Sequence, residues 1–200
     1  MSLNRRHLLL AAPLALAGCG DLLAKQPYTA RTDWPIAPEP GIAAAGSRRG
    51  VVLVRGIQAG PALGDRGLIT LQADGSIHRG YYNRWAVPPA QAVTASLIAW
   101  LQASGEFSAV VGEGSALSPA LIVEGTLDTL LADPTRHVAR AALTLVVAKP
   151  VGIGERPLAQ RRLTATAPLA GPTAPDLVAA QRAALAGVLR QAVAMVESDR

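Results

Sequence analysis

Apolar side chains recur along the chain with two different periods, and these periods separate predicted strands from predicted helices. Short β-branched or alternating runs are typical of strands, whereas apolar residues spaced by three and four positions form one face of a helix. The strand pattern occurs at residues 51–57, 68–72, 77–82, 107–111, 121–131, 138–148 and 162–167. The helix pattern occurs at residues 90–101 and 173–197. The predicted order is therefore β-β-β-α-β-β-β-β-α.

The arrangement of the sheet is predicted mainly from its two long strands, 121–131 and 138–148. Polar and apolar side chains alternate in both, which predicts one buried face and one face in contact with water. Residues 132–135 form a short connection, so the two strands should pair antiparallel. Leu127 and Leu131 are expected to face the core. We expect an α+β fold, a two-layer sandwich in which two helices pack on one face of a mixed, largely antiparallel sheet.

The start of the last helix is also predicted by its residues. Thr173 and Asp176 have the spacing of a capping box, in which the hydroxyl accepts a hydrogen bond from a first-turn amide and the carboxylate reaches back. Pro175 falls within the first turn, where its missing N–H removes no intrahelical bond. The helix should therefore begin directly after Thr173.

Residues 1–18 have the three parts of a secretory signal peptide, and the sequence that follows resembles the bacterial lipoprotein box. A basic start precedes an apolar stretch that is too short to span a bilayer, and the sequence Leu-Ala-Gly-Cys then ends at Cys19. In that class of signals the peptidase cuts between Gly18 and Cys19, a diacylglycerol is attached to the cysteine sulfur, and the new amino group is acylated. No other cofactor is expected.

Two features of this region bear on export and sorting. Arg5 and Arg6 fit both a twin-arginine signal and an ordinary basic n-region, so both export routes stay open. Gly20 is not the Asp that resembles the inner-membrane retention signal of enteric bacteria. We therefore expect a lipid-anchored chain that faces the periplasm, at the outer membrane.

The chain is expected to divide into a signal peptide (1–18), a lipidated tether (19–49) and one α+β domain (50–200). The tether is rich in proline and has no sustained periodicity, which is typical of an extended linker. Tyr28 and Trp34 could dock part of it on the domain.

Composition narrows the classes of function. The chain has 200 residues and is 50% hydrophobic, which excludes disorder for most of it, and its single cysteine excludes an intrachain disulfide. The net charge of +5 comes from basic residues scattered as singles and pairs, without the clustered stripe that a nucleic-acid footprint needs. Only 4% of the residues are aromatic, so the predicted core is aliphatic.

Three motifs follow one another in the first half of the chain. The sequence Leu-Gly-Asp-Arg ends at Asp65 and Arg66, Arg-Trp-Ala-Val-Pro-Pro surrounds Trp85, and Ser-Gly-Glu-Phe occupies residues 104–107. In this order and with the lipoprotein box, they resemble the ABC-type transport auxiliary lipoproteins, the group that includes the lipoprotein of the paraquat-inducible transport system. Val87 and the prolines after it depart from the family pattern and could shift the start of the helix.

The resemblance implies a periplasmic accessory component of a lipid-transport machine built around mammalian-cell-entry (MCE) domain proteins, with an ABC permease and ATPase in the inner membrane. The lipoprotein would help to link that machine to the outer membrane. From the residues alone, Asp65 and Arg66 between two glycines predict a turn with a local ion pair. Trp85 is expected in the core or as a helix staple. The motif is thus expected to be structural.

An enzyme is not expected. His78 and His137 fall in different predicted elements without metal ligands at a suitable spacing, and no Gly-x-Ser-x-Gly elbow occurs.

Two non-enzymatic classes of function remain. One is a docking module that uses the polar faces of strands 121–131 and 138–148 or a free sheet edge, and the other is a lipid carrier or chaperone that holds phospholipid in an apolar cavity. The aromatic-poor core favours the docking module. The expected partners are an MCE-domain protein, ABC subunits, the membrane and a second copy of the chain, with no nucleic acid.

Overall fold

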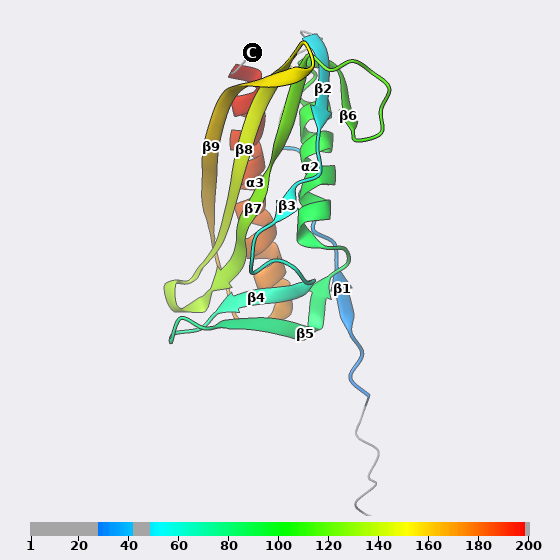
Figure 1. Cartoon of the computed structure of the whole chain (residues 1–200). Helices are drawn as coiled ribbons and strands as arrows, with labels where there is room; N and C mark the ends of the chain where they lie inside the picture. Colours follow the sequence, from blue (N-terminus) through cyan, green and yellow to red (C-terminus); the bar gives the residue numbers. More distant parts are fainter. Residues whose placement is uncertain (1–27, 42–48, 199–200) are drawn as a thin grey trace, which may run out of the picture. The chain divides into compact units, whose positions relative to one another are not determined.

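The computed structural model describes residues 28–41 and 49–198. The chain divides into two compact units, Met1–Ala30 and Arg31–Arg200, and the fold below is that of the second. Its elements in chain order (Figure 1) are β1 (Thr32–Trp34), β2 (Arg49–Val54), β3 (Gln58–Ala59), β4 (Gly67–Leu71), β5 (Ile77–Trp85), α2 (Pro89–Ala103), β6 (Phe107–Gly112), β7 (Leu121–Asp133), η3 (Pro134–Arg136), β8 (Val138–Val151), β9 (Gly154–Pro168) and α3 (Ala174–Ser198).

The strands form one nine-stranded mixed sheet on which the two helices pack, which confirms the α+β class. The main path runs β1-β5-β4-β7-β2-β6, and every neighbouring pair on it is parallel except β4–β5. The expectation of a largely antiparallel sheet is therefore wrong for this path. Antiparallel pairing is found in the β4–β5 hairpin and in the long ladder β7–β8–β9. Alternation along a strand reports which face is buried, but it does not report the direction of the partner.

Strand β7 is the centre of the sheet. One of its edges pairs in turn with β2, β3 and β4, and the other pairs with β8 along nearly its whole length (Figure 1). The register between β7 and β8 shifts between Leu127 and Thr129. This irregularity reverses the alternation, so that Leu130 is buried and Leu131 is only half-buried at the edge of the core. The prediction that Leu131 faces the core is therefore confirmed only in part, because Leu131 packs against the core without being buried in it.

The β8–β9 hairpin is longer than its sequence pattern predicts. Residues 151–157 lack alternation, yet most of them continue the ladder, with Val151 paired to Gly154. The turn is made at Gly152, whose φ of 58° is a left-handed conformation that glycine adopts without the steric cost of a side chain. The hairpin therefore reaches the end of the unit opposite to β4–β5 (Figure 1).

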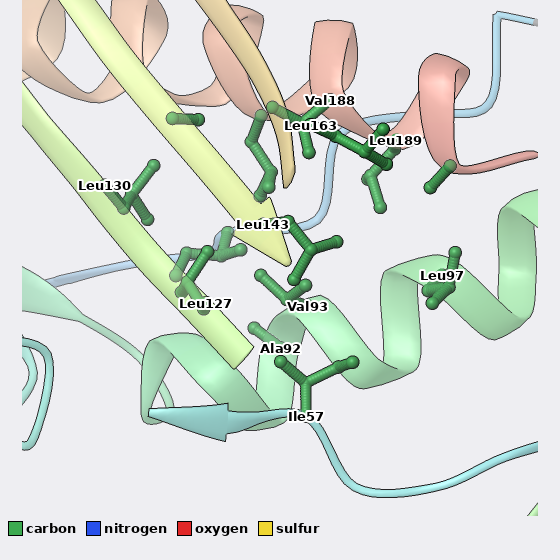
Figure 2. Packing of buried hydrophobic residues seen from close by; sticks show 14 of the residues in the cluster. Ile57, Ala92, Val93, Leu97, Leu127, Leu130, Leu143, Leu163, Val188 and Leu189 are labelled. Atoms are coloured by element: carbon green, nitrogen blue, oxygen red, sulfur yellow. The ribbon is translucent and has the colours of Figure 1, made fainter. Parts of the chain in front are cut away.

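The core lies between the sheet and the two helices. Helix α3 packs on β7, β8 and β9, whereas α2 packs on β2, β3, β6 and β7, and the helices contact each other. Figure 2 shows the leucines of the long strands meeting the apolar faces of both helices. Members of this single cluster that are at most 2% exposed include Val93, Leu97, Trp100, Leu127, Leu143, Val188 and Leu189. As expected, the packing is mainly aliphatic.

Part of the predicted tether belongs to this folded unit. Trp34 donates its indole N–H to Asn83 Oδ1 at 3.2 Å, and Ile36 is 3% exposed. Trp100 donates from Nε1 to the carbonyl oxygen of Pro38 at 2.9 Å. The chain from β1 to Pro38 is therefore held against β5 and α2, by Trp34 as anticipated and by further contacts.

The cap of α3 shows the predicted amide-to-hydroxyl bond, whereas the Asp176 carboxylate reaches back to the Thr173 hydroxyl. The Asp176 amide donates to Thr173 Oγ1 at 3.4 Å, and the Thr173 hydroxyl donates to the Asp176 carboxylate. Helix α3 begins at Ala174, directly after Thr173. A further polar contact ties the helix to the sheet, since the buried Gln181 donates from Nε2 to the carbonyl oxygen of Ile69 at 3.2 Å.

Gly125 in β7 is the site of a stability prediction. A Cβ added there would lie 2.1 Å from the Thr144 carbonyl oxygen and 2.9 Å from Leu145 Cδ2, and the first of these atoms belongs to the backbone of β8. We expect Gly125→Ala to lower the free energy of unfolding by about 1 to 3 kcal/mol, because the β7–β8 ladder must move to admit the methyl group. Chemical denaturation followed by circular dichroism measures this change.

Gly64→Ala is the matched control, since a Cβ at that position has no atom within 4 Å. Equal destabilisation by both substitutions would show that the close approach at Gly125 is not the cause.

Candidate functional site

Asp65 of the sequence motif organises the turn before β4. Its Oδ1 accepts a hydrogen bond from the Gly67 amide at 2.7 Å, and its Oδ2 lies 3.3 Å from Arg79 Nε on β5. The ion pair of Asp65 is therefore made across the β4–β5 hairpin with Arg79. The prediction of a local pair with Arg66 is wrong, because the turn directs the two neighbouring side chains to different partners.

Arg66 and Trp85 lie together, although nineteen positions separate them in the sequence. The Trp85 amide donates to the Arg66 carbonyl oxygen at 2.6 Å, and Arg66 Nη1 donates to the Ala86 carbonyl oxygen at 2.8 Å. Trp85 itself is 1% exposed and belongs to the core. These contacts hold the beginning of β4 against the end of β5.

The motif borders a hollow of about 330 Å³ that sequence reasoning missed. We call it the arginine hollow and define it by its lining residues, which are Arg31, Asp65, Arg66, Gly67, Arg79, Gly80, Tyr81 and Arg84. The four arginines come from the residue before β1, the turn before β4, and β5. No sequence signal joins them, because β1 is only three residues long and pairs in parallel with β5.

Asp33 on β1 partly neutralises this hollow. Arg84 Nε lies 2.6 Å from Asp33 Oδ1, and this hydrogen bond lowers the pKa of Asp33 below its ordinary value, with Arg84, Arg66 and Arg31 adding favourable charge interactions. The same hydrogen bond raises the pKa of Arg84. Asp33 therefore stays ionised as its pair with Arg84 requires.

Exposed aromatic side chains lie beside the arginines. The Arg31 guanidinium carbon lies 4.1 Å from the centroid of the Tyr81 ring. Tyr81 and Tyr82 meet edge to face with their centroids 5.1 Å apart, although they are 64% and 47% exposed. Two large aromatic rings therefore face solvent next to the arginine hollow.

A second candidate surface is the polar face of β7 and β8. Arg55, which follows β2, donates from Nη1 to Glu124 at 2.7 Å and to Glu155 at 3.1 Å, and its Nη2 also contacts Glu155. The hydrogen bonds to Glu155 and Glu124 raise the pKa of Arg55. This network closes one side of a hollow of about 390 Å³, whose other lining residues include Thr126, Val146 and Gln160. We call this surface the polar face.

The polar face continues along the ladder through Asp128. Its Oδ2 accepts a hydrogen bond from the Thr144 hydroxyl at 2.7 Å and lies 3.3 Å from Arg162 Nε. Thr144 pairs in register with Thr126 on β7 and with Arg162 on β9. A half-exposed surface of alternating charged and hydroxyl side chains therefore spans three strands, as the alternation in the sequence predicts.

An apolar hollow lies beside α2. It has a volume of about 440 Å³ and is lined mainly by the proline-rich segment 35–40 and by the small side chains Ala92, Ala95, Ser96 and Ala99. Ser96 is 5% exposed, and its hydroxyl has no hydrogen-bond partner among the described residues.

The described residues contain no group of three or more His, Cys, Asp or Glu side chains placed to hold a metal ion. His78 lies on β5 and His137 follows η3, and neither belongs to such a group among the described residues. Within the same part of the chain, no helix has the length and apolarity that a membrane crossing requires. Gly18 and Cys19 lie outside the described residues.

Comparisons with known proteins identify the class. The model of the family described as "ABC-type transport auxiliary lipoprotein component" matches residues 35–193. The chain belongs to this family, which makes it an auxiliary lipoprotein component of an ABC-type transport system. A comparison with curated proteins finds no match.

Solved structures share the fold at low sequence identity. A protein from Xanthomonas campestris is similar with a TM-score of 0.62 and 18% identity, over 82% of this chain and 91% of the other. A hypothetical protein from Chlamydia trachomatis is similar with a TM-score of 0.56 and 12% identity, over 76% of this chain and 98% of the other. These likenesses support the α+β architecture described above.

Proposed function

We propose that this chain is a non-catalytic, lipid-anchored adaptor that docks the periplasmic part of an ABC transporter containing MCE-domain proteins at the outer membrane. The family match over residues 35–193 carries the proposal, because the family consists of auxiliary components of ABC transport. The matched region includes the whole sheet from β2 to β9 and most of α3. The MCE-domain partner and the outer-membrane location are proposed in addition to membership of the family.

The polar face is the proposed contact with the transporter. Helices α2 and α3 cover the apolar side of the sheet, so the half-exposed side chains of β7 and β8 are left for another protein. Arg55, Glu124 and Glu155 are fixed by one another, with side-chain exposures of 34%, 43% and 34%. Charged groups that are already held in place lose little conformational freedom when a partner binds.

The anchor is proposed to be Cys19. Removal of the signal 1–18 and acylation of the cysteine would attach the chain to the membrane through several acyl chains, and the segment up to β1 would act as the tether. Gly20 supports sorting to the outer membrane, by the analogy with the retention signal of enteric bacteria.

Affinity purification from detergent-solubilised envelopes tests the adaptor. We expect the wild-type chain to recover an MCE-domain protein and ABC subunits, and we expect Val146→Arg to lose most of that recovery, because it places a long cation in the hollow of the polar face. Ala183→Arg on the exposed side of α3 is the matched control and should retain recovery. If the wild-type chain recovers neither class of protein, the adaptor is refuted. If Val146→Arg binds normally, only the placement of the contact is refuted.

The lipid carrier is a second candidate, and the apolar hollow beside α2 is the observation that favours it. Its volume of about 440 Å³ is lined mainly by apolar atoms. A carrier would bind an acyl chain there, and mass spectrometry of the purified chain would find stoichiometric phospholipid that Ala99→Trp abolishes. The adaptor predicts no such stoichiometric lipid.

A further inference from the structure

We propose that the arginine hollow binds the phosphate groups of anionic phospholipids at the surface of the membrane to which the chain is anchored. The inference rests on the proposed lipid anchor at Cys19, and it adds a second, non-covalent membrane contact made by the folded unit itself. The ligand is the phosphodiester of a bilayer headgroup such as that of phosphatidylglycerol.

The first argument is an excess of positive charge. Four arginines line the hollow, whereas the nearby acids are Asp65 and Asp33, which are paired with Arg79 and Arg84. Arg31 and Arg66 have no ion pair with any carboxylate in the described part of the chain. Two cationic side chains of the hollow are therefore available to pair with an anion.

The second argument is that these guanidinium groups are held in position. Arg66 is tethered through Nη1 to the Ala86 carbonyl oxygen at 2.8 Å, and its remaining N–H groups are available to another acceptor. Arg31 lies over the Tyr81 ring. A guanidinium presents a planar fork of donors that matches the oxygens of a phosphate, and a fixed fork loses less freedom on binding than a mobile one. The chemistry of the hollow is thus suited to a phosphate.

The third argument concerns the two tyrosines. Tyr81 and Tyr82 expose large rings beside the arginines, at 64% and 47% exposure. Tyrosine is enriched at the level of lipid headgroups, because its ring favours the apolar boundary while its hydroxyl stays hydrated. A bilayer surface offers partners to both features, because its headgroup level accommodates the exposed tyrosines and its phosphates can pair with Arg31 and Arg66.

The fourth argument is the position of the hollow along the chain. Arg31 follows Cys19 by 31 − 19 = 12 residues. Even a fully extended chain of that length reaches only about 40 Å. The proposed anchor therefore lies no farther than that from Arg31, so binding of a nearby headgroup becomes an intramolecular event with a high effective concentration. An acidic protein surface offers the same charge, but it does not share this covalent proximity.

Vesicle co-sedimentation of the chain from residue 19 onward, carrying Cys19→Ser, tests the proposal without any contribution from acyl chains. We expect binding to vesicles of equimolar phosphatidylglycerol and phosphatidylcholine, and little to pure phosphatidylcholine. Arg31→Gln should lower the partition coefficient about fivefold, the effect of one basic residue near an anionic surface. Raising the salt concentration should weaken binding of the unsubstituted chain.

Arg190→Gln is the control, because it removes the same charge from an exposed position on α3. It should leave partitioning within twofold of the parent. Tyr81→Ala is a second variant, expected to weaken binding with less dependence on salt. Circular dichroism of each variant shows whether the unit remains folded.

Equal binding to both vesicle types, or equal loss in Arg31→Gln and Arg190→Gln, would overturn the headgroup site. It would also be overturned if Arg31→Gln bound vesicles normally but lost its transporter partner during affinity purification, since that result assigns the hollow to an acidic protein. Because these vesicle experiments use unlipidated protein, their failure leaves the lipid anchor and the adaptor function to be judged by their own tests.

Discussion

Trp100→Ala should lower the free energy of unfolding by about 3 to 5 kcal/mol. Trp100 on α2 is 0% exposed and is one of the largest side chains of the core. Its removal leaves a cavity between the helix and the sheet that the surrounding aliphatic side chains cannot fill completely. It also removes the hydrogen bond to the Pro38 carbonyl oxygen, which helps to hold the segment after β1.

Guanidinium chloride denaturation followed by far-ultraviolet circular dichroism measures this loss, provided that the transition stays two-state. Trp100→Phe separates the two contributions, because it keeps an aromatic ring in the core and removes the hydrogen bond. We expect it to lower the free energy of unfolding by a smaller amount than Trp100→Ala. Gln91→Ala on the exposed side of α2 should change the free energy of unfolding by less than about 0.5 kcal/mol. A loss below about 1 kcal/mol for Trp100→Ala would contradict the packing described here.

Cys19→Ser should abolish acylation completely. The thioether to diacylglycerol requires the cysteine sulfur, and the chain has no other cysteine. Each buried methylene of an acyl chain contributes about 0.8 kcal/mol to membrane binding, so the loss of several chains removes most of the affinity. Metabolic labelling with a fatty-acid probe, followed by fractionation of the envelope, measures both effects.

Gly20→Asp is the control for Cys19→Ser, since it changes the neighbouring residue and keeps the sulfur. It should label as strongly as the wild-type chain, and by the analogy with enteric bacteria it should move to the inner membrane. Continued labelling of Cys19→Ser would refute Cys19 as the site of the lipid.

The sequence predicted the long elements well, because periodicity is strongest where a strand or helix has many turns or repeats. Helix α3, with its cap at Thr173 and Asp176, and the ladder of β7 and β8 are examples. Strands β1 and β3 have three and two residues, which is too few to show a period. The irregularity after Leu127 exchanged the roles of Leu130 and Leu131, since no residue type in this stretch marks its position.

The sequence predicted only some of the relative directions of the paired strands. Local turns predicted the antiparallel pairs, but β2 and β4 reach β7 through longer connections, and the turns within these connections do not report the direction of pairing. One signal was available, because the continuous apolar run Val51–Val54 is typical of a strand buried within a parallel sheet. That run favours a larger share of parallel pairs in the mixed sheet than the turns alone indicate.

The candidate sites were predicted to different extents. The motif analysis singled out Asp65, Arg66 and Trp85, and the structure brings all three to the junction of β4 and β5. The arginine hollow could not be found in the same way, because Arg31 and Arg84 meet only through the pairing of β1 with β5. Residues that tertiary structure brings together from separate elements show no recognisable spacing pattern in the sequence.

The central place of β7 has a consequence for how the chain folds. Strands β2, β3 and β4 precede β7 by many residues, yet each uses it as a hydrogen-bonding partner. None of these pairings can form until residues 121–133 are available, so closure of the sheet depends on contacts of high sequence separation. Such contacts make folding slower than that of a domain built mainly from local contacts. Until β7 is available, β2, β3 and β4 therefore lack the strand with which each of them pairs in the finished sheet.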